Sequence, residues 1–464
     1  MKLVSFKVTM FRNIVDSGDI PVDSVTALVG KNESGKSAIL QGLHHLNPAK
    51  PAVTLDLLDE YPRWLKKEHE ISGEIESAVP ISATFELTNA EMGEAEASFG
   101  KGVLASNGIV ASRTYKEPGK IQFTVSLNFK AVIDPFMATL PDRLKTALGE
   151  PSTVIDLLAK LKTIGAATNA TSGEPTPIAI DASEATAALI ARLNGHEGLK
   201  SAVDAFLAER LPRTFYFSSY SSLRGRYPIE TVFAAVSGSG VEEDVIAAAD
   251  FLRLARAVPD TMQDWDYEKS NAELEAASSL LTKRVKEHWH QNDHLKLAVK
   301  IEPQQEVEPG TNQLVIKRHL QFRVEDSRHD FSNRLDRRST GFQWFVSFLA
   351  SFLEFEKDKN LILLLDEPGL SLHARAQMDL LETIETRLAV DRPVIYSTHS
   401  PFLVQTARLN EVRIVEDQGP DLGSTVISDA GIVSDPDTLF PLQAALGYDI
   451  AQSLFIGNRN ILVE

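Results

Sequence analysis

The sequence predicts an α/β fold with a mixed sheet built around a glycine-rich loop, an antiparallel β subdomain and an inserted helical domain. Residues 24–29 are apolar and β-branched, which is typical of a buried strand, and residues 38–43 after the loop have helical spacing. Far downstream, residues 361–365 form an uninterrupted aliphatic run, as a parallel strand buried on both faces requires. Residues 393–400 predict a second buried strand that ends in a polar cluster, and residues 141–211 are rich in alanine and predict helices.

In chain order we expect four regions. They are the first part of the α/β domain at 1–140, a helical insertion at 141–211, the second part of the α/β domain at 212–440, and a linker and strand at 441–464. We expect the insertion to mediate dimerisation; the alternative is that it adds only two helices to the main domain.

Each region has its own expected elements. Strands in the first region are expected at 3–10, 20–22, 25–29, 81–87, 108–115 and 121–129, with a turn-rich charged segment at 51–70. In the insertion, helices at 152–161 and 183–193 flank a loop at 164–181. The third region predicts strands at 214–217, 295–301, 314–316 and 320–324. It also predicts a long helical stretch at 241–288 that is interrupted near Pro259, and a core helix at 342–355.

Composition excludes several classes of protein. An apolar fraction of 43% and a charged fraction of 24% are ordinary for a globular chain, and the absence of cysteine excludes disulfides and thiolate zinc sites. The N-terminus lacks the apolar core of a signal peptide, and the run Phe342–Phe355 is too short to span a bilayer. We therefore expect a cytoplasmic protein without a membrane segment.

The net charge of −17 opposes diffuse attraction to nucleic acid. One local segment is basic, with Lys317, Arg318, Arg323, Arg328, Arg334, Arg337 and Arg338 among fewer acids. These side chains form either a positive patch or a solvated face on which arginines pair with the interleaved acids.

Residues Gly30–Ser37 fit the phosphate-binding pattern GxxxxGK[ST] at every fixed position. In that pattern, loop N–H groups and the helix dipole point at phosphates, and glycine permits close backbone approach. Lys36 then reaches the outer phosphates while the Ser37 hydroxyl binds Mg²⁺, so the pattern predicts ATP and Mg²⁺ as ligands. The flanking strand and helix disfavour a chance match in an ordinary turn. The predicted contact residues here are Gly30, Asn32, Glu33, Ser34, Gly35, Lys36, Ser37 and Ala38.

Two polar clusters follow the downstream strands. Asp366 and Glu367 end an aliphatic strand in the Walker B pattern, in which Asp366 helps to hold Mg²⁺ and Glu367 activates the attacking water. The alternative is that Asp-Glu-Pro begins a turn and caps a helix. His399 ends the next strand, where an imidazole can contact the γ-phosphate and sense hydrolysis; a structural histidine is the alternative.

These motifs, with the segments Arg338–Gln343, Gly369–His373 and Ser397–Ser400, resemble an ABC-type ATPase head of the RecF, SMC and OLD kind. In that family two heads sandwich two ATP molecules. The resemblance implies a homodimer in which Ser339 and Gly341 face the γ-phosphate bound to the partner. It also implies that Arg12 and Asn13 contact the nucleotide.

The segment Arg338–Trp344, which corresponds to the signature motif of ABC-type heads, resembles one family within that group. Its Arg-Ser-x-Gly-Phe-Gln-Trp form, ending at Trp344, is similar to the OLD (overcoming lysogenisation defect) nuclease family. It departs from the common signature, which has two adjacent glycines, by having Thr340, Gly341 and Phe342. The glutamine that usually touches Mg²⁺ in such heads is not identified by the sequence.

The C-terminal segment resembles the beginning of a Toprim domain, which follows the head in OLD nucleases. The resemblance lies in residues 442–450 and in Asn460–Glu464, and it implies that Glu464 is a metal-site acid. The later Asp-x-Asp strand is absent from the sequence, so we expect no DNA cleavage by this polypeptide alone. An ordinary terminal strand is the alternative.

Three functions follow as hypotheses. The first is the ATPase head of an OLD-like DNA endonuclease in antiviral defence, which meets DNA through the full-length protein. The second is a complete ATPase switch that scaffolds a separate effector or helicase-like partner. The third is a DNA-repair ATPase of the RecF or SMC type, for which a sustained heptad run or cysteine hook is expected and not found.

Overall fold

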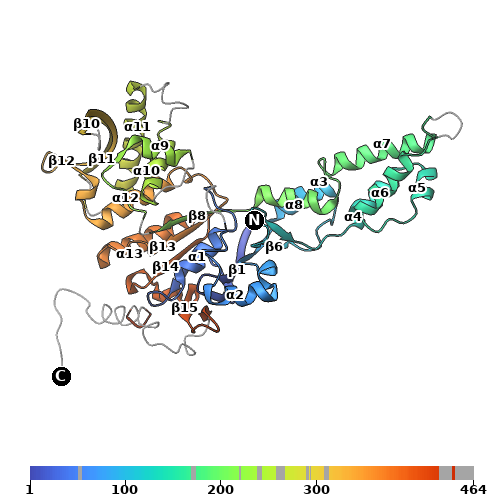
Figure 1. The fold of residues 1–464 in the computed structure, drawn as a ribbon, viewed down its shortest axis with the longest axis horizontal. Helices are drawn as coiled ribbons and strands as arrows, with labels where there is room; N and C mark the ends of the chain where they lie inside the picture. The colour runs from blue at the N-terminus through green and yellow to red at the C-terminus, as the bar shows by residue number, and fades with distance from the viewer. Residues whose placement is uncertain are drawn as a thin grey trace. The chain divides into compact units, whose positions relative to one another are not determined.

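The structure is a computed structural model that describes residues 1–50, 55–168, 174–218, 221–237, 243–257, 267–288, 292, 294–307, 313–427 and 442–444. The chain forms two compact units, each made of several segments (Figure 1). The first unit comprises Met1–Met10, His45–Asn47 and Leu55–Pro212. The second comprises Phe11–His44, Pro48–Thr54 and Arg213–Glu464.

The second unit is built on a sheet that pairs strands from both ends of the chain. Among the described residues the strand order is β16-β15-β4-β14-β13-β8. All neighbours are parallel except β15 and β16, so the sheet is mixed and the predicted α/β fold class is confirmed. The strands are β4 (Val25–Val29), β8 (Arg213–Ser218), β13 (Leu361–Asp366), β14 (Val394–Thr398), β15 (Val412–Asp417) and β16 (Ser424–Ile427).

Helices cover both faces of this sheet. On one face, α1 (Lys36–His44) packs on β8, β13 and β14 (Figure 1). On the other, α12 (Thr340–Phe352) packs its rings against Phe215 and Phe217 of β8. Tyr216, between those phenylalanines, points to the α1 face and stacks on His44, because successive side chains of a strand alternate.

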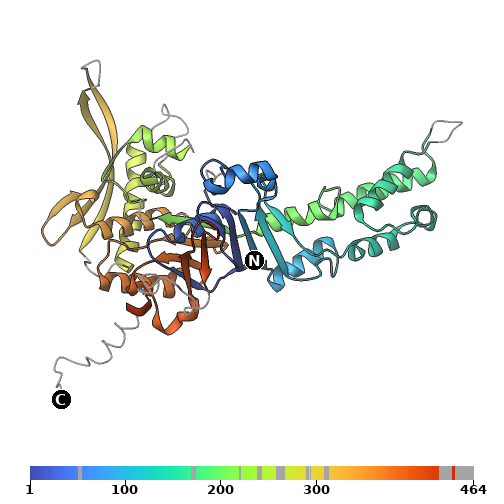
Figure 2. The same ribbon diagram turned by 60° about the horizontal axis from the view of Figure 1, so that its bottom comes forward.

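A long two-stranded ribbon extends from the second unit (Figure 2). It consists of β10 (Leu295–Val307) and β11 (Leu314–Asp326), paired without interruption. The prediction of two separate strands at 314–316 and 320–324 is therefore wrong, because residues 317–319 stay paired with β10. β12 (Phe331–Arg334) and β9 (Arg226–Pro228) flank β11 on its other edge.

The remaining elements of the second unit surround these sheets. Within the predicted helical stretch at 241–288 the described residues form two helices, α10 and α11, and the interruption predicted near Pro259 lies outside the described residues. The elements are β2 (Ile14–Asp16), β3 (Ile20–Pro21), α9 (Ile229–Val236), α10 (Glu243–Leu254), α11 (Tyr267–His288), η3 (Leu335–Arg337), α13 (Ala374–Thr383), η4 (Ile384–Leu388), η5 (Pro401–Leu403) and η6 (Thr406–Glu411).

The first unit contains an antiparallel sheet in which β1 (Lys2–Phe11), β5 (Ile81–Glu86), β6 (Gly108–Arg113) and β7 (Gln122–Thr124) pair in that order. In the stretch predicted to be turn-rich and charged, the described residues also include a helix, α2 (Arg63–Ser72), which begins directly after Pro62 and is followed by Gly73, whose φ is 80°. Proline before a first turn and left-handed glycine after a last turn are common helix boundaries. η1 (Glu74–Ser77) and α3 (Asn89–Phe99) complete this part.

Further helices follow among the described residues of the first unit. They are α4 (Lys130–Thr139), α5 (Asp142–Leu148), α6 (Val154–Gly165), α7 (Pro177–Arg192) and α8 (Leu199–Arg210). Both predicted helices exist but are longer than expected, so the expected loop at 164–181 is shorter. Caps explain the true starts, since the Thr153 and Thr176 side chains accept hydrogen bonds from backbone N–H groups in the first turns of α6 and α7.

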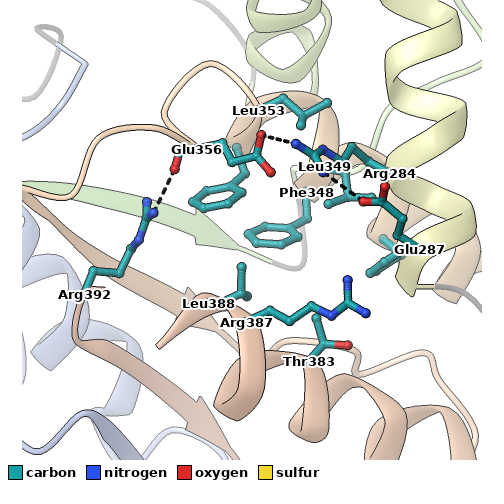
Figure 3. Close-up of a pocket in the computed structure, with 12 residues that line it drawn as sticks. Arg284, Glu287, Phe348, Leu349, Leu353, Glu356, Thr383, Arg387, Leu388 and Arg392 are labelled. Carbon is teal, nitrogen blue, oxygen red and sulfur yellow. Dashed lines mark hydrogen bonds and ion pairs between the residues drawn. The ribbon is translucent and has the colours of Figure 1, made fainter. Parts of the chain in front are cut away.

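A cavity of about 150 Å³ lies where α11, α12 and η4 meet (Figure 3). Phe348 and Leu349 form part of its apolar wall. Arg284 lies 2.9 Å from Glu287 within α11 and 2.9 Å from Glu356, and the second of these ion pairs connects the end of α11 to the segment after α12. Residues of the phosphate-binding loop are not part of its lining.

Candidate nucleotide-binding site

The phosphate-binding loop joins the end of β4 to the N-terminus of α1, as the pattern Gly30–Ser37 predicts. Lys36 is buried, and its Nζ donates hydrogen bonds to the carbonyl oxygens of Gly30 at 3.0 Å and Lys31 at 2.7 Å. Burial lowers the pKa of Lys36, and the nearby Glu367 carboxylate opposes that shift. Backbone carbonyl groups of the loop therefore hold the ammonium group in place.

Both glycines of the motif lie against the C-terminal hairpin of the sheet. A Cβ atom on Gly30 would be 2.3 Å from the carbonyl oxygen of Val415. Gly35 has a φ of 97°, and a Cβ there would be 2.5 Å from Cβ of Ser424. Val415 and Ser424 lie nearly 400 residues downstream of the loop, and no local pattern in the sequence marks them as its neighbours.

The other residues of the loop differ in exposure. Asn32 and Glu33 are exposed, whereas Ser34 and Ala38 are buried. The Ser34 hydroxyl has no hydrogen-bond partner among the described residues. Glu33 adopts a left-handed backbone with a φ of 65°, which turns the loop toward Gly35.

Asp366 is the centre of a hydrogen-bonded cluster. Its Oδ1 accepts hydrogen bonds from Ser37 Oγ at 2.9 Å and from Ser397 Oγ at 2.5 Å, while its Oδ2 accepts from the Tyr216 hydroxyl at 2.8 Å. Ser37 and Asp366 thus present hard oxygen atoms side by side at a helix N-terminus. Such a pair fits Mg²⁺, which binds to proteins through one or two oxygen ligands plus substrate phosphates.

Glu367 lies between two basic groups. Its Oε1 is 3.6 Å from Lys36 Nζ, and its Oε2 is 2.9 Å from His399 Nδ1. The Glu367 N–H donates to Ser397 Oγ at 2.8 Å, and its φ of 48° is left-handed, an uncommon conformation for a residue with a side chain. Ser397, a member of the predicted polar cluster at the end of its strand, therefore orients both acids.

Arg12 and Asn13 reach the same region from the N-terminal segment. Arg12 donates to Gln41 Oε1 of α1. Asn13 Nδ2 donates to Ser424 Oγ at 2.8 Å, and it lies 3.3 Å from the Cβ position of Gly35. Both predicted contact residues are thus adjacent to α1 or to the loop.

The signature residues Ser339 and Gly341 lie on a different element from the loop. Ser339 is exposed and precedes α12, whereas Gly341 is buried against Leu372, whose Cδ2 would be 2.4 Å from a Cβ on Gly341. Gly341 therefore has a packing role within its own chain.

Two further sequence predictions concern the rest of the chain. The basic segment contains arginines paired with acids, since Arg328 and Arg338 approach Asp326 and Arg334 pairs with Asp336. The Toprim-like residues 445–450 and 460–464, with Glu464, lie outside the described residues.

The loop, the strand order and the paired acids define a P-loop α/β domain. Residues 245–404 match the protein family described as the AAA ATPase domain. This match, together with the site, supports an ATPase domain of the AAA or ABC type.

One curated relative and two solved structures also resemble the chain, at low coverage or low sequence identity. A curated relative, an uncharacterized protein of Methanocaldococcus jannaschii, is 30% identical over 117 residues, which are 24% of this chain and 30% of the relative's length. The Smc head domain of Pyrococcus furiosus bound to the C-terminal domain of ScpA covers 97% of this chain and 99% of its own at 11% identity, with a TM-score of 0.38. The SMC head domain of Thermotoga maritima covers 92% and 98% at 12% identity, with a TM-score of 0.32. At these TM-scores the fold assignment rests on the strand order described above.

No helix among the described residues has the length and apolar character needed to cross a lipid bilayer.

Proposed function

We propose that this chain is the ATP-binding and ATP-hydrolysing head of an OLD-like, ATP-dependent DNA endonuclease that acts in defence against phage. The observation that carries the ATPase part is the convergence of Lys36, Ser37, Asp366 and Glu367 from opposite ends of the sequence. The nuclease part is supported by the resemblance of Arg338–Trp344 to OLD nucleases and of the C-terminal segment to a Toprim domain.

The chemistry follows from the positions of these groups. Lys36 and the loop N–H groups neutralise and orient the phosphates, and Ser37 and Asp366 would hold Mg²⁺. Bound Mg²⁺ supplies charge neutralisation on the phosphate oxygens. Glu367 would take a proton from the water that attacks the γ-phosphorus, while the bond from that phosphorus to the bridging oxygen breaks and ADP leaves. His399, whose Nδ1 lies 2.9 Å from Oε2 of Glu367, would contact the γ-phosphate beside that carboxylate.

The proposed partners are a second copy of the chain and DNA. Ser339 is exposed at the start of α12, where backbone N–H groups of a helix N-terminus can contact a phosphate bound to the other copy. ATP would then hold two heads together, and their separation after hydrolysis would regulate the Toprim nuclease domain.

The test measures binding of a fluorescent ATP analogue, ATP turnover and mass in solution. Lys36→Ala is expected to weaken binding about 10- to 100-fold, because charge-assisted hydrogen bonds to phosphate are lost. Glu367→Gln is expected to keep binding, to lower turnover about 10²- to 10⁴-fold and to accumulate an ATP-bound dimer. Lys67→Ala and Glu382→Gln, at exposed positions, are matched controls that should change none of the three measured quantities.

Unmutated turnover in Glu367→Gln would refute the assignment of the base, and unmutated binding in Lys36→Ala would refute the nucleotide site. An ATP-bound protein that stays monomeric would refute the shared site at Ser339.

A further inference from the structure

We infer that Tyr216 is a positioning residue that holds Asp366 for Mg²⁺, as the last link of a one-way chain of hydrogen-bond donors that begins at Arg12. The inference rests on the proposed nucleotide site and adds Tyr216 and Gln41 to it. Arg12 donates to Gln41 Oε1, Gln41 Nε2 donates to the Tyr216 hydroxyl at 3.1 Å, and that hydroxyl donates to Asp366 Oδ2 at 2.8 Å.

The direction of these three hydrogen bonds is fixed by chemistry. A guanidinium can only donate, so Gln41 must present its amide oxygen to Arg12 and its NH₂ group to Tyr216. The Tyr216 oxygen then accepts, and its single proton is directed to the Asp366 carboxylate, which accepts. Each bond polarises the next in the same sense, from a cation at one end to a metal-binding anion at the other.

Strand pairing and ring stacking hold the backbone and the ring of Tyr216 in place, independently of its two hydrogen bonds to Gln41 and Asp366. β8 pairs with β13 in register, so that Tyr216 faces Leu364 and Ser218 faces Asp366. The Tyr216 ring stacks on His44 with centroids 5.5 Å apart, and the His44 ring nitrogen Nδ1 lies 3.0 Å from Thr214 Oγ1. Replacing only the hydroxyl of Tyr216 therefore leaves the strand and the stack intact.

The arrangement divides the two oxygens of Asp366 between different partners. Ser37 and Ser397 donate to Oδ1, whereas Tyr216 donates to Oδ2. This fixes the plane of the carboxylate before a metal arrives. Groups that orient a metal ligand in this way are worth about 10- to 100-fold in metal affinity or activity. Arg12 is the first donor of this hydrogen-bond series. A nucleotide that contacts Arg12 therefore affects the same series of hydrogen bonds that orients Asp366.

The experiment titrates Mg²⁺ against the fluorescent analogue mant-ATP bound to the full chain, and measures mant-ATP affinity separately in EDTA. Tyr216→Phe is expected to raise the Mg²⁺ concentration for half-maximal effect about 10-fold, with affinity in EDTA within about twofold of the unmutated protein. Gln41→Glu still accepts from Arg12 but cannot donate to Tyr216, so it is expected to shift Mg²⁺ dependence in the same direction by about threefold. Tyr115→Phe is the control, because the Tyr115 hydroxyl donates to a backbone oxygen, that of Met10.

A Mg²⁺ midpoint that stays unchanged in both Tyr216→Phe and Gln41→Glu would overturn the inference, as would an equal shift in Tyr115→Phe. In either case Lys36-dependent binding by the unmutated chain would leave the proposed nucleotide site standing. If the unmutated chain binds mant-ATP no better than Lys36→Ala, the nucleotide site fails, and the donor chain loses its function with it.

Discussion

Glu367 combines a predicted catalytic carboxylate with a strained backbone, and the two can be separated by substitution. Its φ of 48° places a residue with a Cβ in the left-handed region, which costs about 1–2 kcal/mol relative to ordinary helical or extended backbone. The same geometry directs its carboxylate toward Lys36 and His399. We therefore expect the strain to be retained for function rather than for stability.

The comparison uses Glu367→Ala and Glu367→Gly, which both remove the carboxylate. The alanine variant keeps the Cβ and therefore the backbone strain. The glycine variant removes about 1–2 kcal/mol of strain from the folded state, but its larger unfolded-state entropy lowers the stability by about 0.5–1 kcal/mol. Glycine should therefore be more stable than alanine by about 0.5–1 kcal/mol. Both variants should lose ATP turnover.

Exposed Glu382 in α13 provides the matched control, because it has the same side chain on a helix. At this position the Glu382→Gly protein should be less stable than the Glu382→Ala protein by about 0.8–1 kcal/mol. Urea unfolding of the four variants measures both differences, which should have opposite signs and lie about 1.3–2 kcal/mol apart. If Glu367→Gly unfolds at the same or lower urea concentration than Glu367→Ala, the argument from backbone strain is refuted.

Two further predictions concern stability. Gly30→Ala is expected to destabilise the protein by about 1–3 kcal/mol in urea unfolding, because the new Cβ would be 2.3 Å from the Val415 carbonyl, a backbone atom that cannot rotate away. Gly93→Ala, with open space around its Cβ, should be neutral or stabilising, and equal effects of the two substitutions would contradict the contact. The hydrogen bonds from Arg328 hold the pKa of Asp326 well below its usual range, so the folded state keeps this carboxylate ionised when the unfolded state takes up a proton near pH 4. Its stabilisation is present above that pH and lost as pH falls below it, so Asp326→Asn should flatten the acid side of a stability–pH profile measured by urea unfolding; an unchanged slope would refute this.

Local patterns in the sequence predicted much of the second unit. Gly30–Ser37 is recognisable because its spacing, its preceding strand and its following helix are all contiguous. The buried strand before Asp366 is recognisable because a strand covered on both faces has to be apolar throughout. These features need only neighbours along the chain, so they can be recognised before the fold is known.

Helix boundaries and strand continuity were less predictable. The start of α7 depends on one threonine cap, which makes the loop before it shorter than composition suggested. Residues 317–319 are polar, yet they remain in β11 because β10 supplies their hydrogen-bond partners. Pairing with a neighbouring strand overrides local propensity in such segments.

The sequence by itself determined that a phosphate-binding loop, two acids and a histidine follow buried strands. Only the tertiary structure decided which residues support them, because Tyr216, Ser397 and Ser424 reach the site from strands far apart in the sequence. A tyrosine between two core phenylalanines resembles any half-buried strand residue until the neighbouring strand places Asp366 at its hydroxyl. The physical reason is that hydrogen bonds and close packing depend on distance in space, which the order of residues does not contain.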